Sequence, residues 1–355
     1  MYLNRRGPFL DQIPHLLQAC SPPARLGRTY LEFLRIVLLY LSVSVPIRIF
    51  TQTDGDPFMY RSILAALAAI SLLLPGWHPA DAQWNYPVDV AAAEDGTIYI
   101  ADLRLPGIWT LKDGQTEVFV QASKKFRTPL NAIRCLRING DGLLHTGDSA
   151  AREVFSVNAE GGLTQLTAPT AVLDETVLSE DLEFTPDNFG LIGIPMDMAF
   201  GSKGEMYVSD TELQRVWKVP AGGGEPEEVL LVNGPRGLAV DDDDNLWVLS
   251  LQAPQLQKVS PDGEVEELIS ELTFEFPHQI ELRGDGTAVV SDGYAKAIWN
   301  VAADGKVEKW ISGEPLDNPV GITFQGENLL IIDPRANALF SAAPDGTLTK
   351  VYPTD

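Results

Sequence analysis

The sequence predicts an all-β protein, namely a six-bladed β-propeller made of four-stranded antiparallel blades. Three observations support this class. A segment of about 40 residues recurs along the chain. Each copy holds four short runs of β-favouring residues. Turn residues separate the runs, including Asp-Gly pairs at 113–114, 262–263, 304–305 and 345–346. One such sheet cannot bury both of its faces alone, whereas six sheets arranged in a ring can.

The copies align on three features: a Pro, the first turn, and an Asp that ends the second run. They begin at Tyr86, Asn131, Ile194, Gly234, Phe276 and Asn318, and the copy at Asn131 is the loosest. The Asp at the end of the second run is present in five of the copies, as Asp102, Asp148, Asp210, Asp292 and Asp333. A residue repeated in nearly every blade serves the blade itself. We therefore predict that these carboxylates accept backbone N–H bonds in the turn before the third strand.

The N-terminal part of the chain has the layout of a secretory signal peptide. Arg61 precedes the apolar run 62–74, Pro75-Gly76 follows it, and small residues lead to Ala82. We predict a signal peptide over 59–82, cut after Ala82. The alternatives are a membrane anchor or an apolar core helix, although the run is shorter than the ~20 residues of a bilayer span. Residues 1–58 are interpreted as an over-extended start or a short membrane-associated segment.

Charge and cysteine content narrow the functional classes. The net charge is -23, which argues against nucleic acid as a partner because nucleic-acid surfaces need clustered Lys and Arg. Only Cys135 remains after the predicted cleavage, so the mature chain has no internal disulfide. We expect a periplasmic or secreted protein, monomeric, with no stable membrane span in the mature chain.

The propeller domain is assigned to residues 83–355, with one insertion. Residues 168–194 fall between the second and third copies and are too short for a blade. The insertion is either a solvated linker or a lid beside the channel mouth, since long insertions often carry function.

The residues after the Pro of each copy open the first strand of a blade, and this strand lines the central channel. They differ between copies, so one mouth of the channel is expected to carry unlike polar side chains. The predicted ligand-binding set is Asp89, Asn131, Arg134, Asp197, Arg236, His278 and Gln279. Burying such groups is costly unless they pair or meet a ligand. The alternative is that Asp89 pairs with Arg134, and Asp197 with Arg236, across neighbouring blades.

The recurring pattern P-x-G/D-(I/L/M)-A-(V/F)-x-x-x-G-x-(L/I/M)-(Y/W)-V-x-D resembles the NHL-repeat signature. The six-bladed propellers of the regucalcin/gluconolactonase and strictosidine-synthase-like enzymes are similar in outline, as is the larger streptogramin B lyase propeller. The resemblance covers about Tyr86 to Tyr352. It is specific for the fold and weak for function, since such folds host many activities.

The gluconolactonase resemblance implies a bound Ca²⁺ or Mg²⁺ that activates water for lactone hydrolysis. Asp89, Asn131 and Asp197 would imitate its ligand order, although Arg residues in the same ring would compete with a cation. The lyase resemblance implies a His near a metal, and His278 is the candidate there and the candidate general base.

Two functional classes follow from these observations. The first is a module that binds a small molecule, a glycan or an envelope protein at the channel mouth. The second is a metal-assisted, lactonase-like hydrolase or a lyase that uses the same polar ring. The sequence has no Walker loop, paired-Cys metal site, Gly-x-Ser-x-Gly elbow or His-Glu-x-x-His motif.

Overall fold

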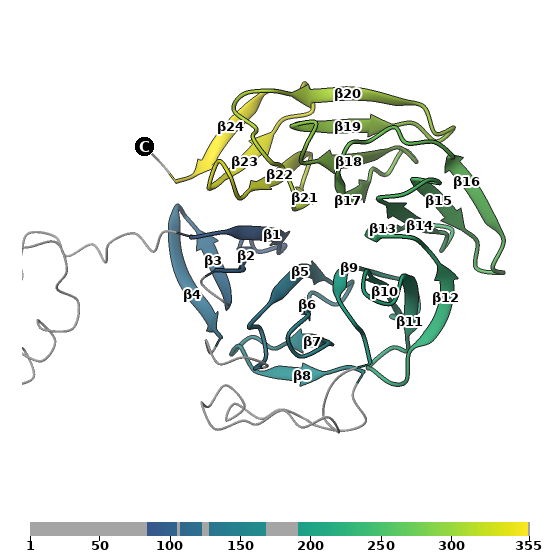
Figure 1. The fold of residues 1–355 in the computed structure, drawn as a ribbon. Helices are drawn as coiled ribbons and strands as arrows, with labels where there is room; N and C mark the ends of the chain where they lie inside the picture. Colours follow the sequence, from purple (N-terminus) through teal and green to yellow (C-terminus); the bar gives the residue numbers. More distant parts are fainter. Residues whose placement is uncertain (1–83, 105–106, 123–127, 168–190, 354–355) are drawn as a thin grey trace, which may run out of the picture. The chain divides into compact units, whose positions relative to one another are not determined.

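The computed structural model describes residues 84–104, 107–122, 128–167 and 191–353. The predicted signal peptide, residues 1–58 and most of the predicted insertion lie outside these ranges. The described residues form six four-stranded antiparallel sheets, each made of four consecutive strands, which confirms the predicted fold. Figure 1 shows the sheets arranged around a centre, with the first strand of each innermost.

The first three sheets follow one another along the chain. Sheet 1 contains β1 (Pro87–Ala92), β2 (Ile98–Asp102), β3 (Gly107–Lys112) and β4 (Gln115–Gln121). Sheet 2 contains β5 (Ile133–Ile138), β6 (Leu144–Asp148), β7 (Glu153–Val157) and β8 (Leu163–Gln165). Sheet 3 contains β9 (Pro195–Phe200), β10 (Met206–Asp210), β11 (Arg215–Val219) and β12 (Glu227–Leu231).

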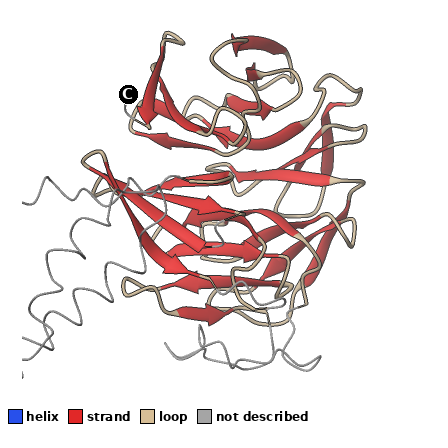
Figure 2. Cartoon of the chain, turned by 60° about the vertical axis from the view of Figure 1, so that its left-hand side comes forward, coloured by secondary structure: helices blue, strands red, loops and turns tan. Residues whose placement is uncertain are grey.

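The last three sheets repeat the same order. Sheet 4 contains β13 (Pro235–Val240), β14 (Leu246–Ser250), β15 (Leu256–Val259) and β16 (Val265–Ile269). Sheet 5 contains β17 (Pro277–Leu282), β18 (Ala288–Asp292), β19 (Ala297–Val301) and β20 (Val307–Ser312). Sheet 6 contains β21 (Ile322–Gln325), β22 (Asn328–Asp333), β23 (Ala338–Ala342) and β24 (Leu348–Tyr352). Figure 2 shows the strands joined by short loops. Within the described ranges, no helix is long and apolar enough to cross a membrane.

The core lies between the sheets. Among the described residues, each pair of neighbouring sheets encloses one apolar cluster. In sheet 1, Ile108 packs in the cluster shared with Phe155 of sheet 2. Ile100 belongs to the cluster shared with Leu339 of sheet 6, so the first sheet packs against the last. Buried apolar area on both faces of every sheet is therefore what holds the ring together.

The ring closes through side chains and not through a shared sheet. Trp84, just before β1, is 2% exposed, and its ring lies 4.3 Å from that of Tyr352 at the end of β24. Asn337 in sheet 6 also donates an Nδ2–H bond to the carbonyl oxygen of Trp84, at 3.2 Å. The two ends of the propeller domain thus meet directly.

In five of the six sheets, the aspartate that ends the second strand holds the blade together, as predicted, whereas sheet 4 has Ser250 at this position. Asp292 accepts N–H bonds from Glu275 and Phe276, both at 2.8 Å, before the inner strand. It also accepts the N–H of Ala295, at 3.2 Å, in the turn that leads to β19. Asp102, Asp148, Asp210 and Asp333 bond in the same two places. The carboxylate therefore ties the entrance of the inner strand to the turn before the third strand.

The inner strand is irregular at its start. The pairing register shifts between Pro87 and Asp89 in sheet 1, and between Pro277 and Ile280 in sheet 5. Sheets 2, 3 and 4 have shifts at the corresponding point. Proline donates no N–H to the ladder, and a bulge re-aims the side chains beside it. This irregularity sets which side chains face the end of the channel.

Candidate functional site

A cavity of about 260 Å³ lies at the end of the channel where the inner strands begin. Each sheet contributes one residue to the cavity wall from the same position of the repeat. In five sheets this residue directly follows the repeat's Pro, and in sheet 2 it follows Ile133. These six residues are Val88, Arg134, Met196, Arg236, His278 and Val320. Tyr86, Leu103, Gln279, Asn318 and Pro334 complete the lining. The cavity therefore has a wall of unlike chemistry built on equivalent positions of a repeated scaffold.

Two arginines give the cavity a basic side. The Arg134 Nε–H donates to Ser149 Oγ at 3.1 Å. The Arg236 guanidinium lies over the ring of Phe276, 4.8 Å from its centroid, and one of its Nη atoms is 3.9 Å from the sulfur of Met196. The buried Arg236 Nε has no hydrogen-bond partner among the described residues. Burial, and then the charge of Arg134, lower the pKa of Arg236 to about 10.

His278 lies beside this basic side in an uncharged state. Its ring packs edge-on against Phe276, with centroids 5.0 Å apart. Burial, and then the nearby charge of Arg236, lower the pKa of His278 to about 3. The imidazole is therefore neutral at physiological pH and offers one donor and one acceptor. Gly293 keeps this place open, because a Cβ there would lie 2.9 Å from His278 Nε2 and 2.4 Å from Asn318 Oδ1.

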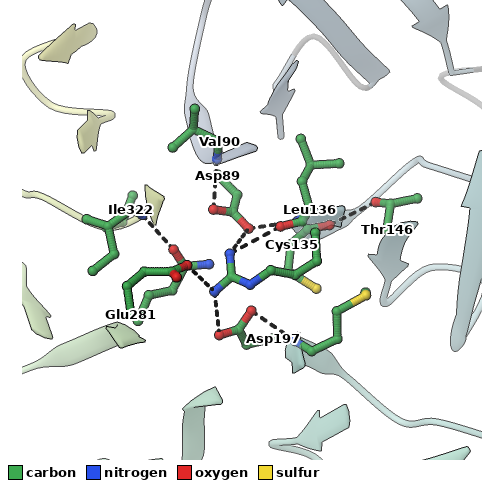
Figure 3. Close-up of polar contacts among 12 residues, drawn as sticks. Asp89, Val90, Cys135, Leu136, Thr146, Asp197, Glu281 and Ile322 are labelled. Atoms are coloured by element: carbon green, nitrogen blue, oxygen red, sulfur yellow. Dashed lines mark hydrogen bonds and ion pairs between the residues drawn. The ribbon is translucent and has the colours of Figure 1, made fainter. Parts of the chain in front are cut away.

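The predicted acidic residues lie elsewhere, around an arginine that the sequence did not single out. Arg137, on β5, is 2.9 Å from Asp197, 3.5 Å from Glu281 and 3.9 Å from Asp89. Figure 3 shows Asp89, Asp197 and Glu281 converging on one guanidinium. Asp89 and Asp197 do not line the cavity. The alternative pairing of Asp89 with Arg134 and Asp197 with Arg236 is wrong, because both carboxylates pair with Arg137.

Three carboxylates around one cation leave excess negative charge in a buried place. Burial raises the pKa of Asp89 to about 7, against the opposing effect of Arg137, and burial also raises the pKa of Asp197. Glu281, whose side chain is 22% exposed, has its pKa raised to about 7 by the same cause. Since like charges disfavour joint ionisation, this group holds protons more tightly than free carboxylates do.

Neighbouring sheets are also joined in pairs by the third residue of the inner strand. In sheets 1, 3 and 5 a side-chain oxygen at this position accepts the backbone N–H of the next sheet's inner strand. The bonds are Asp89 Oδ2 to Leu136 N at 2.7 Å, Asp197 Oδ2 to Leu238 N at 3.0 Å, and Gln279 Oε1 to Ile322 N at 2.6 Å. A structural role between sheets therefore accounts for these three side chains, and Gln279 also reaches the cavity wall.

The three residues that the resemblance implies as metal ligands, Asp89, Asn131 and Asp197, do not form a metal site. Asp89 and Asp197 are occupied by Arg137 and by backbone N–H groups. Asn131 lies in the turn before β5, where its N–H bonds the carbonyl of Thr128 at 3.2 Å. In the described part of the chain, no three His, Cys, Asp or Glu side chains are placed to hold a metal ion. The residues around Asp89 and Asp197 thus do not fit a divalent cation, because a guanidinium already fills that position.

Sequence reasoning missed Arg137 and Glu281, although the repeat contains a signal. Both stand at the fifth position of their inner strands. The equivalent residues of sheets 1, 3 and 4 are Ala91, Ala199 and Ala239. A long charged side chain where the repeat has Ala marks a position with its own role.

Comparison with known proteins extends the description of the fold. The chain matches no protein-family model and no curated protein. Among solved structures, it is similar to a streptogramin B lyase, with 19% identity and a TM-score of 0.56 over 77% of this chain and 85% of that one. It is also similar to a gluconolactonase from Xanthomonas campestris, with 15% identity and a TM-score of 0.58 over 76% and 87% of the two chains. A structure of the nidogen/laminin complex gives 15% identity and a TM-score of 0.52 over 72% and 89%. At these identities the likeness shows the β-propeller fold and no particular activity, while the number of blades follows from the six sheets of this chain.

Proposed function

We propose that this protein is a binding module that holds a small molecule in the cavity at one end of the propeller channel. The proposal depends on one observation: the blades repeat the same structure, but the residues that they contribute to the cavity wall differ. The six wall residues occupy equivalent positions of one repeat, yet they are two Val, two Arg, one Met and one His. Packing alone would favour the same small residues in every copy. Unlike polar and apolar groups converging on one concave space are the usual mark of a ligand site.

The size of the cavity favours a small molecule over a protein partner. Pockets for drug-sized ligands run from about 300 to 1,000 Å³. A space of about 260 Å³ falls just below that range. A protein partner would instead need a surface of roughly 800 Å² on this side alone. A glycan fits this site only through a terminal sugar that enters the cavity.

The test is a ligand screen by thermal shift, repeated with the cavity narrowed. Val88→Phe places a ring in the wall, whereas Val118→Phe makes the same change on β4, where the side chain is 44% exposed. A ligand of the cavity is expected to stabilise the wild type and Val118→Phe, and to lose this effect with Val88→Phe. If every ligand found stabilises Val88→Phe as well as the wild type, the cavity is not the binding site.

A hydrolase or lyase that uses the same cavity is the second candidate. Its support is that His278, the predicted base, lines the wall in a neutral state. A pKa of about 3 makes this imidazole a weak base at neutral pH, which is why binding ranks first. His278→Asn separates the two functions. An enzyme would lose turnover and keep its ligand, whereas a binding module would show no turnover before or after the change.

Export of the mature chain is also part of the proposal. Cleavage after Ala82 would leave Trp84 in the mature protein, and Trp84 is needed to close the ring. Mass spectrometry of the protein purified from the producing cell tests this, with an N-terminus at Gln83 expected. An N-terminus at Met1 or Met59 would contradict it.

A further inference from the structure

The two arginines of the cavity wall form no ion pair with a carboxylate of the described residues. Among the described residues, neither Arg134 nor Arg236 has a carboxylate within ion-pair distance. The carboxylates of Asp89, Asp197 and Glu281 are engaged with Arg137 instead. The protein as a whole carries a net charge of -23, so acidic residues to neutralise these two positions are not scarce in the sequence. Their absence from this wall is therefore a property of the site.

The two guanidinium groups also act on each other unfavourably. Arg236 is partly buried, its Nε has no partner among the described residues, and the charge of Arg134 adds to burial in lowering its pKa. Two like charges placed together at a partly desolvated site cost free energy. An anion bound between them would remove this cost and satisfy the free N–H groups.

The way Arg236 is held suits such recognition. Its Cζ lies over the ring of Phe276, 4.8 Å from the centroid, and its buried Nε–H has no hydrogen-bond partner among the described residues. Planar N–H groups match carboxylate and phosphate oxygens in pairs. Arg134 comes from β5 and Arg236 from β13, so the two approach from either side of sheet 3. An acidic group held between them would be contacted from two directions.

The other residues that line the cavity indicate what the rest of the ligand is like. Val88 and Val320 line the cavity from sheets 1 and 6, together with the ring of Tyr86. His278 and Asn318 add uncharged polar groups to the lining. A molecule that fits has an acidic end and a compact uncharged body.

We infer that the ligand of this cavity is a small organic anion whose carboxylate or phosphate group is held between Arg134 and Arg236. The inference rests on the proposed function, since it names the chemical class of the molecule that the cavity binds. It excludes cationic ligands such as polyamines, which would add a third positive charge to the site.

The test compares probes of one shape and different charge. Succinate, succinamide and 1,4-diaminobutane are titrated into the wild-type protein at constant ionic strength, with inorganic phosphate as a separate arm. Calorimetry is expected to detect succinate, phosphate or both, and neither the amide nor the amine. A response to succinate alone identifies a carboxylate ligand, and a response to phosphate alone identifies a phosphate ligand. Equal binding of succinamide would overturn the inference.

Three variants locate the effect. Arg134→Gln and Arg236→Gln are each expected to weaken the anion at least tenfold. Arg283→Gln is the matched control, because Arg283 also stacks on aromatic rings but follows the far end of β17. It is expected to leave binding unchanged. An anion that binds all three variants as it binds the wild type would place the anion site elsewhere and refute the assignment.

The outcomes also separate this inference from the proposed function. A neutral ligand that is lost with Val88→Phe and unaffected by both arginine variants would keep the binding module and reject the anion. If no probe binds, the melting temperature of unliganded Arg134→Gln decides. Relief of repulsion predicts that this temperature is unchanged or raised, whereas a fall of several degrees would assign Arg134 a structural role and reject the inference.

Discussion

A Cβ atom on Gly237 would lie 2.6 Å from the backbone nitrogen of Ile280, so the inner strands of sheets 4 and 5 approach too closely for any side chain there. The third position of the inner strand alternates around the ring. Sheets 1, 3 and 5 carry Asp89, Asp197 and Gln279, and sheets 2, 4 and 6 carry Cys135, Gly237 and Gly321. The two glycines lie against the sheet that follows them, because a Cβ on Gly237 would lie 2.7 Å from Gln279 Cα and one on Gly321 would lie 2.6 Å from Asp89 Oδ1. The glycines therefore allow the close approach of sheet 4 to sheet 5 and of sheet 6 to sheet 1, whereas the side-chain-to-backbone bonds join three other pairs of neighbouring sheets.

Gly237→Ala is expected to destabilise the protein by about 1–3 kcal/mol, the usual cost of overpacking a tight contact. The backbone of sheet 5 would have to move, because the methyl group meets main-chain atoms of Gln279 and Ile280. Urea unfolding measures the change. Gly284→Ala is the matched control, since nothing lies within 4 Å of its Cβ position. Equal stability of the two variants would mean that the close approach at Gly237 is not a constraint.

Asp89→Asn is expected to change how stability depends on pH. Burial raises the pKa of Asp89 to about 7, against ~3.9 in an unfolded chain. Between these values the folded state holds the proton more tightly, so stability falls as the pH rises towards 7. Asparagine does not titrate. Relative to the wild type, the free energy of unfolding of the variant should therefore rise by about 1–3 kcal/mol between pH 5 and pH 8.

Urea unfolding at several pH values between 5 and 8 tests this difference. The charged groups that face Asp89 are Arg137 and Asp197, and both remain in the variant. Asp95→Asn is the control, because a hydrogen bond from Lys112 lowers the pKa of that exposed carboxyl to about 2. It is ionised in both states throughout this range, so its curve should run parallel to that of the wild type. A parallel curve for Asp89→Asn would contradict the raised pKa.

The fold could be predicted because each blade encodes its own strands and turns. A hydrophobic run and an Asp-Gly pair act locally, and six copies leave little choice of architecture. The same alignment brought Arg134, Arg236 and His278 to one position of the repeat, and the structure places all three on one cavity. The depth at which each side chain lies was not predictable. It depends on the bulge at the start of the inner strand.

The pairing of charges depends on contacts across the ring, which no local pattern records. Arg137 comes from sheet 2, whereas Asp197 and Glu281 come from sheets 3 and 5. Ring closure is similar, since the contact of Trp84 with Tyr352 joins residues at opposite ends of the domain. Local sequence therefore predicted the blades, and only their assembly showed which polar residues serve the scaffold and which face the cavity.

Cys135 is expected to be unreactive in the folded protein. Its thiol is fully buried, and burial, with Asp197 and Asp89 adding to it, raises its pKa well above the usual value. Thiolate is the reactive form, so both access and ionisation oppose modification. Alkylation followed by mass spectrometry should find Cys135 unmodified in buffer and fully modified in denaturant. Cys135 alkylated in buffer as fast as free cysteine would show that the interface of sheets 2 and 3 opens readily.

Trp84→Ala is expected to weaken the ring at its closing interface. Sheets 1 and 6 share no strand, so their contact depends on a cluster in which Trp84 is one of two buried tryptophans. Removing a buried Trp typically costs about 3–5 kcal/mol. Urea unfolding should detect this loss, and Leu231→Ala, at a position 65% exposed, should stay within about 0.5 kcal/mol of the wild type.

Because Tyr352 would lose its partner as well, Tyr352→Ala should add little in the Trp84→Ala background. Full additivity of the two changes would mean that closure does not depend on this pair.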